Sequence, residues 1–215
     1  MNTKVLRSLS YGVYITTTMD GQRPTGCITN SVMQITSSPA TVAVSVNHDN
    51  YTNGCIEKNG FFAVSILAVD SDASLIGRFG FQSGRDVDKF EGISYENVEG
   101  VPVITDGCGY VVCKLIDKME TSTHTVFLGE IIAGEIGSKT EPMTYAYYHN
   151  VIKGKSPKNA PTYIPEETKA EPECNVKVKH VCSVCGFEYC GDPLPEGYTC
   201  PVCRQPASVF KRVEE

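Results

Sequence analysis

Cys182-Ser183-Val184-Cys185 and Cys200-Pro201-Val202-Cys203 are two CxxC pairs with fourteen residues between them. A CxxC turn places two sulfur atoms on the same side of a tight loop, and two such loops facing each other surround one ion with a tetrahedron of thiolates. A segment of about forty residues buries too little apolar surface to fold alone, so a bound metal would also hold this segment together. We therefore interpret four residues as the ligands of one metal ion: Cys182, Cys185, Cys200 and Cys203.

The ligand set alone leaves the metal open, because four thiolates suit either zinc or a single iron ion. Gly186 directly follows the second cysteine, Phe187 and Tyr189 supply aromatic rings, and Phe210 closes the segment. Together with the CxxC pairs, these residues resemble the rubredoxin family. The resemblance implies one iron per chain, with sulfur atoms that accept backbone hydrogen bonds. Arg204 departs from the pattern, since many rubredoxins have a second glycine there. A structural zinc ribbon is the alternative interpretation.

Length and composition fit one substantial domain followed by a small one. The chain has 215 residues, of which 41% are hydrophobic and 20% are charged, as in an ordinary globular protein. The formal net charge of −6 argues against a nucleic-acid partner, because a polyanion is held by clustered Lys and Arg side chains. The sequence contains no apolar run of membrane length and no signal-peptide pattern, so we expect a cytoplasmic protein without a membrane partner. We expect free thiols at Cys27, Cys55, Cys108 and Cys113.

The pattern of the first 136 residues predicts many strands with short helices between them. Branched and aromatic residues are typical of strands in residues 11–18, 25–36, 41–46, 61–66, 101–104, 110–119 and 124–136. Helices are expected at residues 4–9, from Asp49 or Asn50 to Gly60, and at residues 71–79. This order predicts a mainly β fold with a closed or nearly closed antiparallel barrel. Neither GxGxxG nor GxxxxGK[ST] is present, which disfavours dinucleotide-binding and P-loop folds.

The composition between Lys153 and Lys177 changes to Pro, Lys, Glu and Asn. We predict a first domain of residues 1–155, a linker of residues 156–177 and a metal domain of residues 178–215. A linker extended at about 3.1 Å per residue would span roughly 70 Å. Such a linker would let the metal domain reach well beyond its own barrel.

Polar side chains gather at the ends of two predicted strands. Thr29, Asn30 and Ser31 precede one strand, and residues 47–52 follow another. Short hydroxyl and amide side chains suit a phosphate or a ribityl chain, and a helix that begins near Tyr51 adds the positive end of its dipole. The same residue types are also ordinary turn and cap residues. The residues alone leave both interpretations open.

Several motifs follow one another within residues 5–163, namely residues 28–31, 38–39 with 42–47, 62–67, 77–79 with 84–90, and 123–130. Together they resemble the flavin reductase-like family of FMN-binding split barrels. The resemblance implies that Thr29, Asn30 and Ser31 contact the flavin or its ribityl chain, and that Asn47, Tyr51 and Thr52 help to hold the phosphate. It also implies a homodimer with each FMN near the interface. The implied FMN-binding set is completed by Ser45 and by the charges of Arg85 or Lys89.

His124 is the candidate catalytic residue. In the family, the corresponding segment lies near the flavin, where a nicotinamide can stack, so the resemblance implies a role for His124 beside the electron donor. A histidine at the mouth of a strand can equally be structural. Tyr147, Tyr148 and His149 form a further polar and aromatic cluster, which we expect to pack at the end of the barrel or in a dimer contact.

An FMN-binding split β-barrel joined to a small C-terminal rubredoxin-like metal domain resembles the high-molecular-weight rubredoxins, over nearly the whole chain. FMN accepts two electrons together and can release them singly, whereas one iron ion carries one. The resemblance implies an oxidoreductase that passes electrons from NAD(P)H through FMN to the iron, and then to an external acceptor such as a flavodiiron oxygen or nitric oxide reductase. Two alternatives remain: a flavin reductase with a structural zinc ribbon, and a pure electron carrier loaded by a separate reductase.

Overall fold

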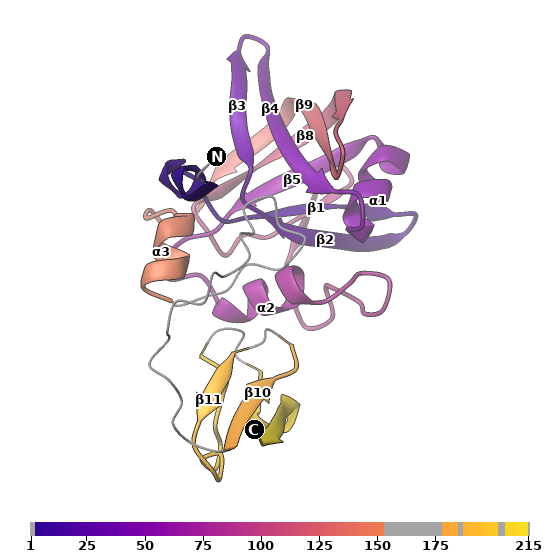
Figure 1. Ribbon diagram of the computed structural model, residues 1–215. Coiled ribbons are helices and arrows are strands. Elements are labelled where there is room, and N and C mark those ends of the chain that lie inside the picture. The colour runs from indigo at the N-terminus through magenta and orange to yellow at the C-terminus, as the bar shows by residue number, and fades with distance from the viewer. Residues whose placement is uncertain (1–2, 153–177, 185–186, 202–204, 215) are drawn as a thin grey trace.

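The computed structural model describes residues 3–152, 178–184, 187–201 and 205–214 (Figure 1). Most of these residues surround one seven-stranded sheet, whose neighbouring strands follow the order β2-β1-β5-β8-β9-β4-β3. Each neighbouring pair is antiparallel, so the expectation of a mainly β, antiparallel fold is confirmed. The strands are β1 (Tyr14–Asp20), β2 (Arg23–Thr29), β3 (Val32–Ser37), β4 (Ala40–Asn47), β5 (Phe61–Ile66), β8 (Gly109–Glu120) and β9 (His124–Ile136).

The sheet curls until its distant strands share one core. Buried side chains from five strands meet in a single cluster, which includes Cys27 of β2, Val44 of β4, Phe62 of β5 and Phe127 of β9. In the part of the chain that the structure describes, β2 and β3 are the outer strands of the sheet, and such edges need cover or closure. The barrel is therefore split rather than fully closed.

The predicted strand at residues 25–36 is in fact two strands. β2 ends at Thr29 and β3 begins at Val32, and the chain crosses between them at Asn30 and Ser31. The backbone N–H of Ser45 donates to the carbonyl of Ser31 at 3.0 Å, so this crossing is held by β4. Residue pattern alone missed the break because β-forming residues continue on both sides of it.

Two of the helices have a polar side chain that caps their first turn. In α1 (Tyr51–Asn59), the side chain of Asn50 accepts from the backbone N–H of Thr52, and Gly60 closes the helix in the left-handed region with φ of 72°. In α2 (Ala73–Phe81), Asp72 caps the first turn through the N–H of Ser74. The expected helix at residues 71–79 is therefore displaced by two residues.

The remaining elements cover the ends of the sheet. η1 (Thr3–Ser8) is a 3-10 helix, α3 (Tyr145–Asn150) is a short helix, and β6 (Glu96–Val98) pairs with β7 (Val101–Val103). A second core lies between the sheet and α2, and it contains Phe79, Phe90, Met143 and Tyr148. Because residues of α2 and α3 pack in this second core, the two helices help to close one end of the barrel.

Among the helices of the described residues, none is long and apolar enough to cross a membrane.

The C-terminal segment forms its own three-stranded sheet in the order β11-β10-β12. Its elements are β10 (Val178–Cys182), β11 (Glu188–Cys190), η2 (Ala207–Val209) and β12 (Phe210–Glu214). The predicted linker of residues 156–177 lies outside the described residues, so the proposed domain boundaries stay predictions. The thiols of Cys27, Cys55, Cys108 and Cys113 are free, as expected.

Candidate functional site

A cavity of about 290 Å³ lies where the ends of β2 and β4 meet the start of α1 and the end of α2. Its walls come from residues 27–30, 45–47, 49–51 and 79–83, with Val13, Ile76, Tyr145 and Tyr148. β2 and β4 both end in polar residues, whereas α2 is apolar on its buried face. The cavity therefore has a polar side and an aromatic side, a combination typical of cofactor sites.

Five of the predicted FMN-binding residues line this cavity: Thr29, Asn30, Ser45, Asn47 and Tyr51. They come from three separate segments, which the sheet brings to one end of the barrel. Ser31, Thr52, Arg85 and Lys89 do not line it, and neither does the candidate catalytic residue His124. The contacts of these other residues decide what each of them can do.

Ser31 and Thr52 lie behind the cavity wall. The hydroxyl of Ser31 donates to Oδ1 of Asn30 at 3.1 Å, so it can orient the amide that the cavity exposes. Thr52 is 1% exposed, and its backbone N–H donates to Oδ1 of the cap residue Asn50 at 3.1 Å. Asn50 lines the cavity and was missed as a site residue, because its sequence signal was that of a helix cap.

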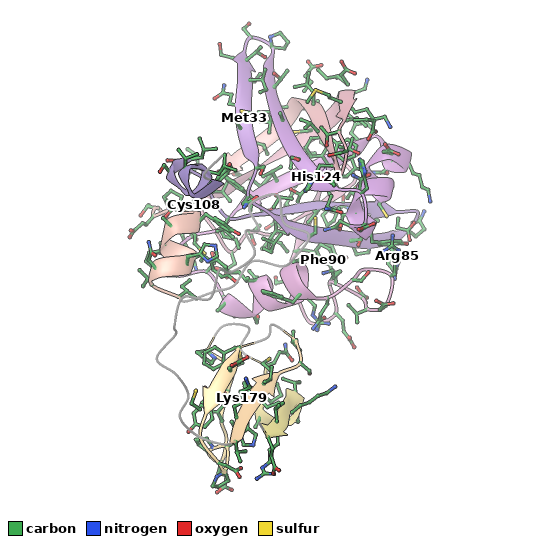
Figure 2. The ribbon with its side chains drawn as sticks, viewed as in Figure 1. Met33, Arg85, Phe90, Cys108, His124 and Lys179 are labelled. Carbon is green, nitrogen blue, oxygen red and sulfur yellow. The ribbon has the colours of Figure 1, made fainter. Side chains whose placement is uncertain are left out.

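A cationic cluster surrounds Tyr51 at the start of α1. The Tyr51 hydroxyl donates to Oδ2 of Asp20 at 2.5 Å, and Nη2 of Arg23 lies 3.2 Å from the same hydroxyl. The guanidinium carbons of Arg23 and Arg85 lie 5.6 Å and 5.4 Å from the centre of the Tyr51 ring. Figure 2 shows Arg85 in the loop that follows α2, and its Nη1 donates to the carbonyl of Asp49 at 3.1 Å.

This cluster carries two positive charges against the one carboxylate of Asp20. The hydrogen bond from Tyr51 is the largest cause that lowers the pKa of Asp20, followed by Arg23, so the carboxylate stays ionised at neutral pH. The surplus positive charge and the helix start suit an anionic group such as a phosphate. Sequence reasoning missed Arg23, because no local pattern joins a residue of the β1–β2 hairpin to the first residue of α1.

Lys89 is placed differently from its predicted position beside the phosphate. It is 2% exposed, and its Nζ donates to the carbonyl of Arg78 at 2.6 Å and to the carbonyl of Gln82. These carbonyls belong to the last turn of α2, where no backbone N–H of the helix can reach them. Lys89 therefore holds the helix end that carries residues 79–83 of the cavity wall.

Burial lowers the pKa of Lys89 from 10.5 to about 8. Between about pH 8 and 10.5 the unfolded chain binds a proton that the folded chain has released, so this residue makes stability rise with pH in that window. A tenfold change in proton affinity corresponds to about 1.4 kcal/mol, so the free energy of unfolding rises by about 3 kcal/mol across this window.

We expect the free energy of unfolding of wild type to rise by this amount relative to that of Lys89→Met between pH 8 and 10.5, measured by urea unfolding. The exposed Lys114→Met is the control. Parallel pH profiles for wild type and Lys89→Met would contradict a buried charge.

His124 begins β9 and pairs in register with Asn47 of β4. Its Nδ1 lies 2.8 Å from the hydroxyl of Thr123. Its Nε2 is buried and has no hydrogen-bond partner among the described residues. Burial, and then the neighbouring His48, lower the pKa of His124, so a neutral imidazole is favoured at pH 7. Figure 2 shows His124 on the sheet, and it stays a candidate through its pairing with the cavity residue Asn47.

The aromatic cluster near residue 147 belongs to α3. Tyr148 is buried in the second core and lines the cavity. Tyr147 packs against the same core as a partly buried residue, and the ring of His149 lies 4.3 Å from that of Tyr145. The expectation that this cluster packs at the end of the barrel is confirmed. Tyr145, which also lines the cavity, was missed.

The two described cysteines of the candidate metal site meet in one cluster. Cys182 and Cys200 are 1% and 0% exposed, and Phe187, Val209 and Phe210 pack against them. Their backbone N–H groups donate to the carbonyls of Phe187 at 2.8 Å and Gln205 at 2.9 Å. Two cysteines from separate CxxC pairs, buried in one cluster, fit a shared metal ion. Cys185 and Cys203 lie outside the described residues, and their roles as ligands stay predictions.

A model of the flavin reductase like domain matches residues 6–155. The chain belongs to this family. This flavin reductase-like chain is 39% identical to a protein of Moorella thermoacetica named high molecular weight rubredoxin, over 99% of this chain and 100% of the relative. It is 37% identical to a ferric-chelate reductase (NAD(P)H) of Archaeoglobus fulgidus, over 76% of this chain and 98% of the relative.

Among solved structures, an NADH:FAD oxidoreductase of Streptomyces globisporus C-1027 matches this flavin reductase-like chain with a TM-score of 0.61 and 26% identity, over 65% of this chain and 83% of that one. The predicted mainly β, flavin reductase-like fold is thereby confirmed for residues 6–155. The predicted resemblance to high-molecular-weight rubredoxins is also confirmed, because the Moorella relative aligns with nearly the whole chain.

Proposed function

We propose that this chain is an electron-transfer oxidoreductase that passes electrons from NAD(P)H through FMN to a mononuclear iron centre and on to an external acceptor protein. One observation carries the proposal: a flavin reductase-like domain and two paired CxxC motifs occur in a single chain. The relative that aligns over the whole chain is named a high molecular weight rubredoxin, which supports the same combination. A flavodiiron protein is the acceptor that we propose.

The residues of the cavity fit an FMN molecule. The Arg23–Tyr51–Arg85 cluster would hold the phosphate, and the polar residues Thr29, Asn30, Ser45 and Asn47 would hold the ribityl chain. Phe79 and Phe81 would pack against the apolar ring system. FMN supplies the exchange between a two-electron donor and a one-electron acceptor, while the protein orients the cofactor and excludes water.

His124 is the residue that we propose to contact the nicotinamide. Its support is a neutral ring with a buried Nε2 that has no partner among the described residues, since a buried nitrogen of this kind gains stability when a ligand supplies the missing hydrogen bond. The Thr123 hydroxyl beside Nδ1 would set the orientation of the ring.

We propose iron at the four-cysteine site, because a redox-active ion gives the flavin domain an outlet in the same chain. Cys182, Cys185, Cys200 and Cys203 would bind it, and iron in thiolate coordination supplies one-electron transfer. The apolar and aromatic residues packed around Cys182 and Cys200 would shield the ion from water.

We also propose a homodimer. Large apolar side chains are exposed on η1 and β3, among them Val5 and Met33 at 63% and 64% exposure. Exposed apolar residues that gather on neighbouring elements are a common sign of a protein interface. Their burial by a second copy would also cover β3, which is an edge strand.

A flavin reductase with a structural zinc ribbon is the second candidate. The Archaeoglobus relative is named a ferric-chelate reductase and is matched over 98% of its length by only 76% of this chain. Nearly the whole of that relative is therefore matched without the remaining quarter of this chain. This comparison favours a barrel that can reduce a small acceptor without help from the C-terminal segment.

Anaerobic titration with NADH, followed at the flavin and ferric-thiolate absorption bands, tests the proposal. We expect both bands to bleach and the end point to lie at about 1.5 equivalents of NADH per chain, since the flavin takes two electrons and the iron one. A colourless metal site and an end point near one equivalent would favour the zinc alternative. A protein that neither NADH nor NADPH reduces would be a pure carrier.

A further inference from the structure

Phe81, the last residue of α2, contacts three parts of the molecule. Its ring packs against the core beneath the sheet, it lines the candidate flavin cavity, and it packs against the cluster formed by Cys182 and Cys200. Figure 1 shows the same arrangement at the level of the chain, with β10 and β11 lying beneath α2. At Phe81 the cavity and the buried thiols therefore share one wall.

The end of α2 is a rigid support for this side chain. Phe79 is 1% exposed in the core, and Lys89 bonds the carbonyls of Arg78 and Gln82 on both sides of Phe81. The described contacts of the sheet and helices therefore fix the backbone at Phe81, whereas its ring is only partly buried. A large apolar ring at the end of a helix gains stability when another surface covers it.

We propose that Phe81 is the docking contact for the metal domain of the same chain. The cluster around Cys182 and Cys200 would cover the ring of Phe81, so that the metal domain would lie against the cavity wall and not merely at the end of a linker. The purpose of this contact rests on the proposed function, whereas the contact itself does not. The step that it would serve moves one electron from the reduced flavin to a ferric ion, which becomes ferrous, and no atom is transferred. Phe81 is a positioning residue in this step.

Hydrogen–deuterium exchange of the full chain, loaded with FMN and with redox-inert zinc, tests the contact. In Phe81→Ala we expect the amides of residues 73–82 and of β10 to exchange about five- to tenfold faster than in wild type, as expected when an aromatic interface anchor is removed. The full-length Cys200→Ser chain is the undocked reference for α2. Ile116→Ala removes an exposed apolar side chain from β8, outside both the cavity wall and the cluster around Cys182 and Cys200, and should leave both regions unchanged.

Reading both sides of the contact separates docking from damage to the barrel. A barrel that is only loosened by Phe81→Ala would change exchange in α2 but not in β10, and this outcome would overturn the inference. Unchanged exchange on both sides would overturn it as well. Protection that depends on protein concentration would show docking onto a second copy, which contradicts a contact within one chain.

The iron-loaded protein separates this inference from the proposed function. In rapid mixing with NADH, we expect the rate of iron reduction divided by the rate of flavin reduction, both measured on the same protein, to be about tenfold lower in Phe81→Ala than in wild type, because an undocked domain must find the barrel by diffusion. Normal iron reduction together with unchanged exchange would refute the docking contact and leave the function standing. A flavin that NADH does not reduce would refute the function, while the exchange data would still decide the contact.

Discussion

Replacing Cys200 with Ser is expected to abolish metal binding and unfold the C-terminal sheet, while the barrel keeps its FMN. Cys200 is fully buried, and a serine hydroxyl does not replace a thiolate ligand. Metal binding contributes about 10–16 kcal/mol to small metal domains, far more than the few apolar residues packed around Cys182 and Cys200 supply. Metal analysis, visible absorption and FMN content of the purified variant measure the outcome.

Cys108→Ser is the matched control, because Cys108 carries a partly exposed free thiol on the barrel. That variant should keep both cofactors. FMN lost together with the metal from Cys200→Ser would show that the barrel depends on the C-terminal segment for its folding. The barrel and the thiol site share no buried core residue, although Phe81 packs against both, and this argues for independent folding.

A chain that ends at residue 155 is expected to keep NAD(P)H-dependent flavin reduction and to lose electron transfer to the acceptor protein. The family model ends at residue 155, and 76% of this chain matches 98% of the Archaeoglobus relative, so the fragment should fold. Adding the isolated segment 178–215 at about 10 μM should leave transfer roughly a hundredfold slower than in the full chain. The reason is that a tether supplies an effective concentration that reaches roughly millimolar.

Stopped-flow reduction of the flavin and turnover with the acceptor are the two measurements for this fragment. Equal acceptor reduction by the fragment and the full chain would mean that electrons leave from the barrel. The C-terminal segment would then be a structural ribbon, as in the second candidate function. Slow flavin reduction in the fragment would instead place part of the nicotinamide site in the removed segment.

Short-range signals account for most of the fold that the sequence predicted. The cap residue Asn50 and the left-handed Gly60 bound α1 as expected, and β9 covers residues 124–136 as predicted. Each of these features depends on residues only a few positions apart, because capping and strand alternation act over one turn or one pair of residues. The same holds for the CxxC pairs, although they leave the choice between iron and zinc open.

Long-range contacts decided the details of the candidate site. Sheet pairing carries Arg23 to the ring of Tyr51, 28 positions along the chain. The path after α2 turns Lys89 away from a phosphate and onto the carbonyls of the helix end. No periodic pattern encodes these meetings, because they depend on which strands are neighbours and on where the loops return.

The sequence by itself determined the class of the protein: a mainly β flavin domain and a four-cysteine segment in one chain. Residue type, alternation and ligand spacing are local properties, and they were sufficient for that conclusion. Only the tertiary structure decided which polar residues line the cavity, and that Phe81 lies between the cavity and the buried thiols. The physical reason is that burial and contact are properties of the folded chain, since packing joins side chains from elements far apart in sequence.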